Sequence, residues 1–319
     1  MNFKILGTGS YTPNNVVTND DLSTMVETND EWITKRVGIK QRNISVEDTT
    51  SSMAIKAAFN ALENSNVKAE DLDMIIVSTI TPDRASPAVA CMVQNAVGAT
   101  CPAFDVSAAC SGFIFALETA AAHMALGKAH KILVVGAERL SSITDFTDRS
   151  TCIIFADGAG AVVVSDEEDN LLASVLNTTG GDEVLNIPSA TGTSPFYKGE
   201  KIEHTKIYMN GGETYKFAIS SMQKDILNVM QQANLTNDNI NWVVPHQANI
   251  RIIKEAARKL PIDKDKFCTN IATTGNTSSA SVAILLDEVN RAGKINRGDN
   301  IIMAAFGAGL CSGAMAIRW

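Results

Sequence analysis

The chain has 319 residues, of which 45% are hydrophobic and 19% are charged, and its formal net charge is −8. This length is ample for a sizeable core in two domains or in one large duplicated unit. The negative charge disfavours nucleic acid as a partner, and no apolar run approaches the roughly 20 residues that cross a bilayer. Residues 1–15 lack the long apolar stretch of a signal peptide, so we expect a cytoplasmic protein without a membrane partner.

Six cysteines are scattered along the chain without a paired CxxC spacing, which disfavours a structural zinc site. In a reducing compartment they are free thiols, and most such thiols act as small buried hydrophobic residues. We therefore expect no metal site. The early Gly7-Thr-Gly9 lacks the third glycine of a dinucleotide fingerprint, so it does not predict a Rossmann loop.

Apolar β-rich runs alternate with helical patterns along the first half, which predicts an α/β protein with largely parallel strands. A buried strand is predicted at 74–78, an almost wholly apolar helix at 111–126 before Gly127, and another buried strand at 132–136. An earlier helix is predicted from one face of apolar residues at helical spacing, formed by Ile55, Ala58, Phe59 and Leu62.

The second half repeats this order of elements, which indicates a duplication. The matched segments are 75–77 with 242–244, the helix after Cys110 with 278–289, 132–135 with 301–305, and 160–164 with 313–317. We predict two similar halves, residues 1–170 and 171–319, that share one interface. Residues 171–215 are rich in Gly, Asn and Thr and are interpreted as an insertion or crossover between the halves.

Cys110 is a candidate nucleophile in the segment Asp105-Val-Ser-Ala-Ala-Cys-Ser-Gly. Small residues that lead into a helix let the backbone turn sharply and leave a thiol accessible. Unpaired N–H groups at a helix N-terminus lower the pKa of such a thiol, and the thiolate is the reactive form. The alternative interpretation is a helix cysteine that only fills space.

His246 and Asn276 are the next candidates for chemistry. His246, in Pro245-His-Gln-Ala-Asn, directly follows a predicted strand, where parallel sheets carry functional loops; a hydrogen-bonded loop histidine is the alternative. Asn276 precedes a buried helix as Cys110 does in the first half, and a pseudo-twofold axis would bring the two helix starts together. Asparagine is also a common helix N-cap. The turn Phe306-Gly-Ala-Gly follows a buried strand and can direct backbone N–H groups at an oxyanion.

Four segments in this order together resemble the β-ketoacyl-[acyl-carrier-protein] synthase III family of the thiolase superfamily. They are Asp-Val-Ser-Ala-Ala-Cys-Ser-Gly, Pro-His-Gln-Ala-Asn, Gly-Asn-Thr-Ser-Ser-Ala-Ser and Phe-Gly-Ala-Gly. The resemblance covers essentially the whole chain. It implies a duplicated thiolase-like α/β fold, with the halves stacked in five α-β-α-β-α layers, and a homodimer.

The resemblance also implies a decarboxylating condensation that initiates fatty acid biosynthesis. Cys110 takes the acyl group from acyl-CoA, and malonyl-acyl carrier protein then enters and loses carbon dioxide. His246 and Asn276 stabilise the enolate-like charge, and the carbanion attacks acyl-Cys110. The backbone N–H groups of Cys110 and Ala308 form the oxyanion hole. No cofactor is implied, because coenzyme A enters only as the substrate thioester.

Substrate-binding residues are implied as well. Trp32 and Arg149 match the pair that sandwiches the adenine of coenzyme A, a stacking that suits an arginine. The whole implied coenzyme A set is Thr28, Trp32, Arg36, Arg149, Gly211 and Asn249. The acidic carrier protein needs a basic patch, which one helical face after His246 offers, although such a face is more often merely solvated. The docking set is Lys216, Arg251, Lys254, Arg258 and Lys259.

Two positions depart from the family pattern. Ala308 stands where many members have glycine, which constrains the backbone but keeps the N–H donor. Ser86, in the loop 81–87, stands where the best-known members place a phenylalanine that lines the primer pocket across the dimer interface. A smaller residue predicts a wider or more polar acyl pocket, so longer or branched primers stay open beside acetyl-CoA.

Several other classes share some of these residues. A thiolase needs a second cysteine where Phe306 stands, and an elongating ketosynthase needs a histidine where Asn276 stands. The alternatives kept open are a synthase III paralogue or acyltransferase of secondary metabolism with a different primer or acceptor, a Cys–His–Asn hydrolase, and a non-enzymatic acyl-CoA-binding protein.

Overall fold

Two mixed sheets form the frame of the molecule in a computed structural model that describes residues 2–189, 194–199, 202 and 205–319. The first sheet has the order β1-β7-β6-β4-β5 and the second the order β11-β12-β13-β8. The strands of the first are β1 (Lys4–Tyr11), β4 (Met74–Ser78), β5 (Ala103–Val106), β6 (Lys131–Arg139) and β7 (Asp157–Ser165). Those of the second are β8 (Leu171–Thr178), β11 (Trp242–Pro245), β12 (Asn300–Gly307) and β13 (Cys311–Arg318). Two small pairs add β2 (Val16–Thr18) with β3 (Gln41–Asn43), and β9 (Leu185–Asn186) with β10 (Tyr208–Met209).

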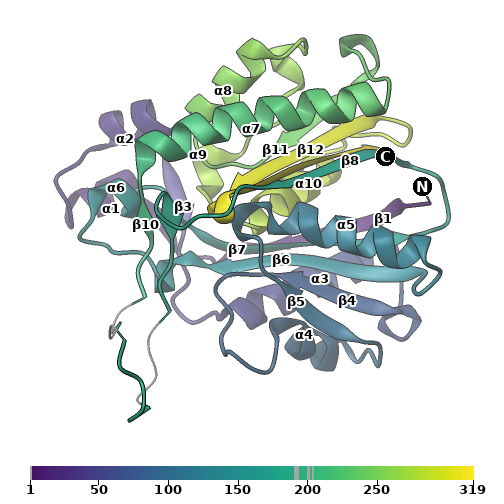
Figure 1. The fold of residues 1–319 in the computed structure, drawn as a ribbon, viewed down its shortest axis with the longest axis horizontal. Helices are drawn as coiled ribbons and strands as arrows, with labels where there is room; N and C mark the ends of the chain where they lie inside the picture. The colour runs from purple at the N-terminus through teal and green to yellow at the C-terminus, as the bar shows by residue number, and fades with distance from the viewer. Residues whose placement is uncertain (1, 190–193, 200–201, 203–204) are drawn as a thin grey trace.

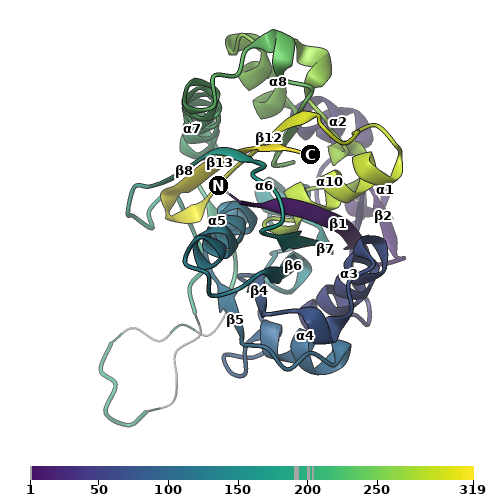
Figure 2. The same cartoon turned by 90° about the vertical axis from the view of Figure 1, so that its right-hand side faces the viewer.

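Helices lie in three layers around these sheets (Figures 1 and 2). The outer layers are α3 (Thr50–Ser65) with α4 (Val89–Val97) on the first sheet, and α7 (Gly211–Gln232) with α8 (Ile250–Lys259) on the second. Between the sheets lie α5 (Gly112–Ala125) and α10 (Ala280–Arg291), whose apolar side chains share one core with both sheets. The shorter helices are α1 (Asn19–Ser23), α2 (Asp30–Val37), α6 (Arg149–Cys152) and α9 (Ile271–Thr274). The predicted five-layer α-β-α-β-α architecture is confirmed.

The two sheets repeat one topology, as the matched sequence segments predict. β4 runs parallel to β6 and β11 runs parallel to β12, while β7 and β13 are antiparallel to their neighbours on both sides. The fifth position, which β5 fills in the first sheet, is an isolated bridge between Val243 and Phe267 in the second. The division after residue 170 falls between β7 and β8.

The interpretation of 171–215 as an insertion is wrong for its first part. Residues 171–178 are strand β8, which pairs with β13 as an integral strand of the second sheet. The remainder holds β9 and β10, and it includes residues 190–193, 200–201 and 203–204, which lie outside the described residues.

The predicted face of helix α3 is also partly wrong. Phe59 is 49% exposed, and the buried face is formed mainly by alanines. The reason is a close approach to β1: a Cβ added to Gly9 would clash with the Ala61 nitrogen and lie 2.5 Å from the carbonyl oxygen of Ala57. The Gly-Thr-Gly segment therefore serves helix packing. Among the described helices, none is long and apolar enough to cross a membrane.

The close packing of β1 against α3 can be tested with Gly9→Ala. We expect this change to lower the free energy of unfolding by about 1–3 kcal/mol, because the added methyl group has no space beside the α3 backbone. Urea unfolding followed by circular dichroism measures the loss. Gly180→Ala is the matched control, since no atom lies within 4 Å of its added Cβ. Equal stability of the two variants would contradict the packing argument.

Candidate active site

A pocket of about 460 Å³ is lined by residues of both halves. It brings together Cys110, His246 and Asn276, which lie far apart in the sequence but were predicted to meet. Each of them follows or precedes an element of the central layers: Cys110 stands before α5, His246 after β11, and Asn276 before α10. The pocket therefore opens where the two buried helices begin.

Cys110 lies in a short 3₁₀ turn, Ala109–Ser111, directly before α5. Burial raises the pKa of its thiol to about 12; a hydrogen bond from the Ser278 side chain lowers the pKa, and the negative charge of Glu138 raises it. A backbone hydrogen bond at Cys110 also lowers the pKa, as expected at the start of a helix, but burial outweighs it because it keeps water from solvating the thiolate. The resting nucleophile is a thiol.

His246 is held at the end of β11 by several contacts. Its backbone N–H donates to the carbonyl oxygen of Ala304 at 2.8 Å, and its ring Nδ1 lies 3.0 Å from Ser281 Oγ. The Gln247 N–H donates to the same Ser281 oxygen at 2.7 Å, which favours donation of the Ser281 hydroxyl proton to Nδ1 and leaves the imidazole proton on Nε2. Burial lowers the pKa of His246 to about 3, so the ring is neutral at pH 7. A neutral ring can donate a hydrogen bond without carrying charge.

Asn276 is fixed through its backbone by the other half. Its N–H donates to the carbonyl oxygen of Ile154, and its carbonyl oxygen accepts the N–H of Ala156 at 2.9 Å. Its side-chain Oδ1 accepts the N–H of Ser278 at 2.9 Å, which orients the amide and leaves Nδ2 as the group that can donate into the pocket.

Cys110 and Asn276 were expected to occupy equivalent positions in the two halves, but the residue equivalent to Cys110 lies two positions after Asn276. Helix α5 begins at Gly112 and α10 at Ala280, so Ser278 stands at the same distance before its helix as Cys110 does. Asn276 comes two residues earlier, on the same turn. Both turns contain a left-handed residue that is not glycine, with φ of 48° at Ala109 and 49° at Ser278.

The glycine turn after β12 packs directly against the nucleophile. A Cβ added to Gly307 would lie 2.6 Å from the Cys110 nitrogen, so only glycine permits this approach. Ala308 follows in the turn and lines the pocket together with Cys110. The aromatic ring of Phe306 lies 5.2 Å from the His246 ring in an edge-on arrangement.

One side of the pocket holds most of the residues implied for coenzyme A. Trp32 on α2 is 38% exposed, and the Arg149 guanidinium lies 4.8 Å from the centre of its ring, so a base that enters between them has to displace the guanidinium. Arg36, Gly211 and Asn249 also line the pocket. Thr28 does not: it is half-buried, and its hydroxyl has no hydrogen-bond partner among the described residues.

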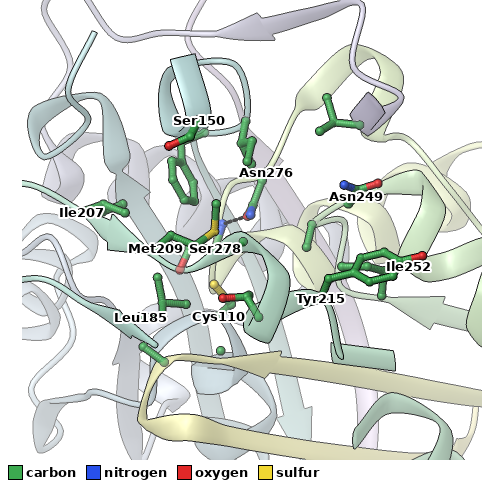
Figure 3. A pocket seen from close by; sticks show the side chains of 18 of the residues that line it. Cys110, Ser150, Leu185, Ile207, Met209, Tyr215, Asn249, Ile252, Asn276 and Ser278 are labelled. Carbon is green, nitrogen blue, oxygen red and sulfur yellow. Dashed lines mark hydrogen bonds between the residues drawn. The ribbon is translucent and has the colours of Figure 1, made fainter. Parts of the chain in front are cut away.

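The other side of the pocket is apolar (Figure 3), and sequence analysis missed its residues. Figure 3 shows Leu185, Ile207 and Met209 on one side of Cys110, with Tyr215, Asn249 and Ile252 on the other. Leu185, Ile187, Ile207 and Met209 of this side lie within 171–215, which was interpreted as an insertion or crossover. Ser86 is exposed in the single chain and does not line this pocket, so its effect on the primer stays a prediction that depends on a second copy.

The predicted docking residues are all exposed, four of them on α8. Several of their charges are already paired: Arg258 lies 2.8 Å and Lys259 3.6 Å from Glu255, and Lys216 lies 2.8 Å from Glu213. Arg251 stacks over Tyr215 at the pocket. Within the described part of the chain, Lys254 alone of the five has no ion pair or ring contact.

The fold and the Cys–His–Asn pocket define a condensing acyltransferase of the thiolase fold. Two family models match the chain: 3-oxoacyl-[acyl-carrier-protein (ACP)] synthase III over residues 104–180, and the C-terminal part of the same family over residues 230–319. The chain belongs to the β-ketoacyl-[acyl-carrier-protein] synthase III family. This assignment replaces the alternatives of a thiolase, a hydrolase and a non-enzymatic binding protein.

Individual relatives support the same assignment. The synthase III of Clostridium acetobutylicum is 45% identical over 99% of this chain and 98% of that protein, and that of Clostridium beijerinckii is 48% identical over 100% and 99%. The crystal structure of synthase III from Aquifex aeolicus VF5 matches with a TM-score of 0.93 at 45% identity, over 99% of this chain and 100% of that one. The priming β-ketosynthase of the R1128 polyketide pathway matches with a TM-score of 0.92 at 33% identity, over 99% and 96%.

The protonation state of the resting nucleophile is testable by alkylation. With a pKa of about 12, the thiolate fraction of Cys110 grows about tenfold per pH unit, so its rate of reaction with iodoacetamide should do the same from pH 7 to pH 10. Mass spectrometry of the Cys110 peptide measures the rate, and the protein unfolded in urea gives the reference for an ordinary thiol. A rate that levels off below pH 9 in the folded protein would show that the helix N-terminus outweighs burial.

Proposed function

We propose that this protein condenses an acyl-CoA primer with malonyl-acyl carrier protein, releasing carbon dioxide and forming β-ketoacyl-acyl carrier protein at the start of fatty acid biosynthesis. The observation that carries the proposal is the pocket in which a partly buried thiol, a neutral histidine and an oriented asparagine amide come together. A nucleophile and two uncharged donors are what acyl transfer followed by enolate formation needs.

The first half-reaction is acyl transfer to Cys110. The sulfur attacks the thioester carbon of acyl-CoA, the bond between that carbon and the sulfur of coenzyme A breaks, and the thiol proton leaves with coenzyme A. The intermediate oxyanion is stabilised by the backbone N–H groups of Cys110 and Ala308, which the tight contact at Gly307 brings together. Coenzyme A lies along Trp32 and Arg149, and the acyl chain enters the apolar side of the pocket.

The second half-reaction is decarboxylation and condensation. His246 Nε2 and Asn276 Nδ2 donate hydrogen bonds to the thioester oxygen of the malonyl group, which takes on negative charge as the bond to the carboxylate breaks. The enolate carbon then attacks the carbonyl of acyl-Cys110, and the Cys110 sulfur leaves and takes up a proton. A neutral His246 suits this role, since it stabilises charge by hydrogen bonding alone. No electron is transferred, and His246 and Asn276 supply the stabilisation of the enolate, so the proposed reaction needs no redox cofactor and no metal ion.

We further propose a cytoplasmic homodimer that receives acidic carrier protein near α8. Among the described strands, β5 has a partner on one side only, so its outer edge is available to a second copy. Ser86 is exposed in the loop that follows β4 and would then face the partner's pocket. Arg251, beside the pocket, and Lys254, which has no ion pair with any described residue, are the best placed of the basic residues to meet the carrier protein.

The experiment that tests this function separates the two half-reactions. Purified protein is incubated with malonyl-acyl carrier protein and acyl-CoAs from acetyl to decanoyl, including branched ones, and both acyl-Cys110 and β-ketoacyl product are followed by mass spectrometry. Cys110→Ala should form neither. His246→Ala and Asn276→Ala should still form acyl-Cys110 but lose product by about 100- to 1000-fold, because each removes one donor to the enolate oxygen.

Other outcomes would overturn parts of the proposal. Acyl-Cys110 with every primer but no ketoacyl product would indicate an acyltransferase or a paralogue with another acceptor. Free acid without release of carbon dioxide from the malonyl group would indicate hydrolysis. Product formation that survives in Cys110→Ala would remove this residue from the mechanism.

The stacked pair at the mouth of the pocket gives a separate prediction. Arg149→Ala should raise the KM for acyl-CoA about 2- to 30-fold, the range expected for a lost cation–π contact between the guanidinium and the bound base, and leave kcat nearly unchanged. Steady-state rates at varied acyl-CoA measure both constants. Lys68→Ala, which removes an exposed basic residue paired with Glu70, is the control. A lower kcat with an unchanged KM would place Arg149 in the chemical step instead.

A further inference from the structure

Glu138 is a buried carboxylate that the reaction described above does not use. It lies near the end of β6 and is 0% exposed. No ion pair with a Lys, Arg or His is found for it in the described part of the chain. Burial raises its pKa to about 7, although hydrogen bonds from Thr81, Ser279, Ile80 and Thr79 lower it. A carboxylate without a cation is unfavourable in a protein interior unless its hydrogen bonds compensate.

The hydrogen bonds of Glu138 join the two halves of the molecule. From the first half, Thr81 Oγ1 donates at 2.7 Å, and Thr79 Oγ1 and the Ile80 N–H donate to the same carboxylate. From the second half, Ser279 Oγ donates at 2.8 Å and Ser278 Oγ at 3.3 Å. The carboxylate therefore ties the turn after β4 to the turn before α10.

The second of these turns carries the active-site contacts. The Ser278 N–H donates to Asn276 Oδ1. The single hydroxyl proton of Ser278 can be donated either to Glu138 or to the Cys110 sulfur, and donation to the sulfur lowers the pKa of Cys110. Ser278 also has φ of 49°, a left-handed conformation that is unfavourable for a residue with a side chain and needs support from its surroundings. β6 approaches this turn closely, since a Cβ added to Gly136 would lie 2.6 Å from the Ser279 carbonyl oxygen.

We propose that Glu138 is a positioning residue for the condensing reaction: its carboxylate holds the turn 278–279 and, through Ser278, sets the positions of Asn276 and Cys110. This inference rests on the proposed function. A glutamine in its place keeps the shape but turns one acceptor into a donor. The Ile80 N–H, which donates to both carboxylate oxygens and cannot reverse its direction, then loses one of its two acceptors whichever way the amide lies. A misplacement of the reacting groups by about 1 Å can cost about 100-fold in rate.

The first test compares two isosteric changes of buried carboxylates. Glu138→Gln should lower kcat about 10- to 100-fold at an unchanged KM for acyl-CoA, because the coenzyme A contacts at Trp32 and Arg149 do not depend on the turn. Asp225→Asn is the matched control: this carboxylate on α7 is also buried and accepts from Asn177, but it does not line the pocket. A loss of stability without a loss of kcat per folded molecule in Glu138→Gln would overturn the proposal.

The second test asks whether Glu138 acts through Ser278. If it does, Glu138→Gln should change kcat little in a Ser278→Ala background, although it changes kcat strongly in the wild type. If the two substitutions instead lower kcat independently, so that their effects multiply, Glu138 does not act through Ser278. Should Glu138→Gln fail to fold, Ser278→Ala against Ser279→Ala decides the point, since of the two side chains only that of Ser278 bonds to Cys110, and only Ser278 lines the pocket. Equal kcat in these two variants would contradict it.

A further readout is the reactivity of the thiol itself. The charge of Glu138 raises the pKa of Cys110, so Glu138→Gln should speed alkylation of Cys110 at pH 8 while it slows condensation. Slower alkylation would contradict the proposed link between Glu138 and Cys110. The wild type is measured in parallel. If the wild type forms no ketoacyl product, the proposed function is refuted but the role of Glu138 is not. The rate of acyl-Cys110 formation in Glu138→Gln and in the wild type then still tests whether Glu138 positions the nucleophile.

Discussion

The packing of α5 and α10 between two sheets is the constraint on which the rest of the molecule depends. A helix covered on both sides has to be apolar on nearly every face, and its polar N-terminal turn has to lie at the edge of the core. The duplication places two such turns next to each other. The pocket, the nucleophile and the asparagine all follow from this arrangement.

The same burial decides the electrostatics of the site. It opposes charge on Cys110, His246 and Glu138, so the thiol is protonated, the histidine is neutral and the carboxyl of Glu138 has a raised pKa. Uncharged donors in such surroundings cost little to bury, yet they stabilise an oxyanion strongly once it forms. A dry site built from neutral groups is therefore suited to a reaction in which negative charge exists only transiently.

The pocket divides its tasks between two kinds of wall. The side with Trp32, Arg149 and Asn249 is partly exposed and polar, which suits a nucleotide and its phosphates. The side formed by Leu185, Ile187, Ile207 and Met209 is apolar and suits an acyl chain. Cys110 lies between them, where a thioester joins these two parts of the same substrate.

Much of this could be predicted from the sequence, because the signals are local or periodic. Apolar runs of strand length and their repetition gave the α/β class and the two halves, and the short segments around Cys110, His246 and Asn276 identified the site. Other features depend on contacts between distant segments. The pKa of Cys110, the buried face of α3 and the hydrogen bonds between Glu138 and the turn 278–279 each depend on residues of another element. The spacing of residues in a sequence reflects local backbone preferences. The desolvation of a side chain and the close approach of two elements arise only after the two halves have packed together.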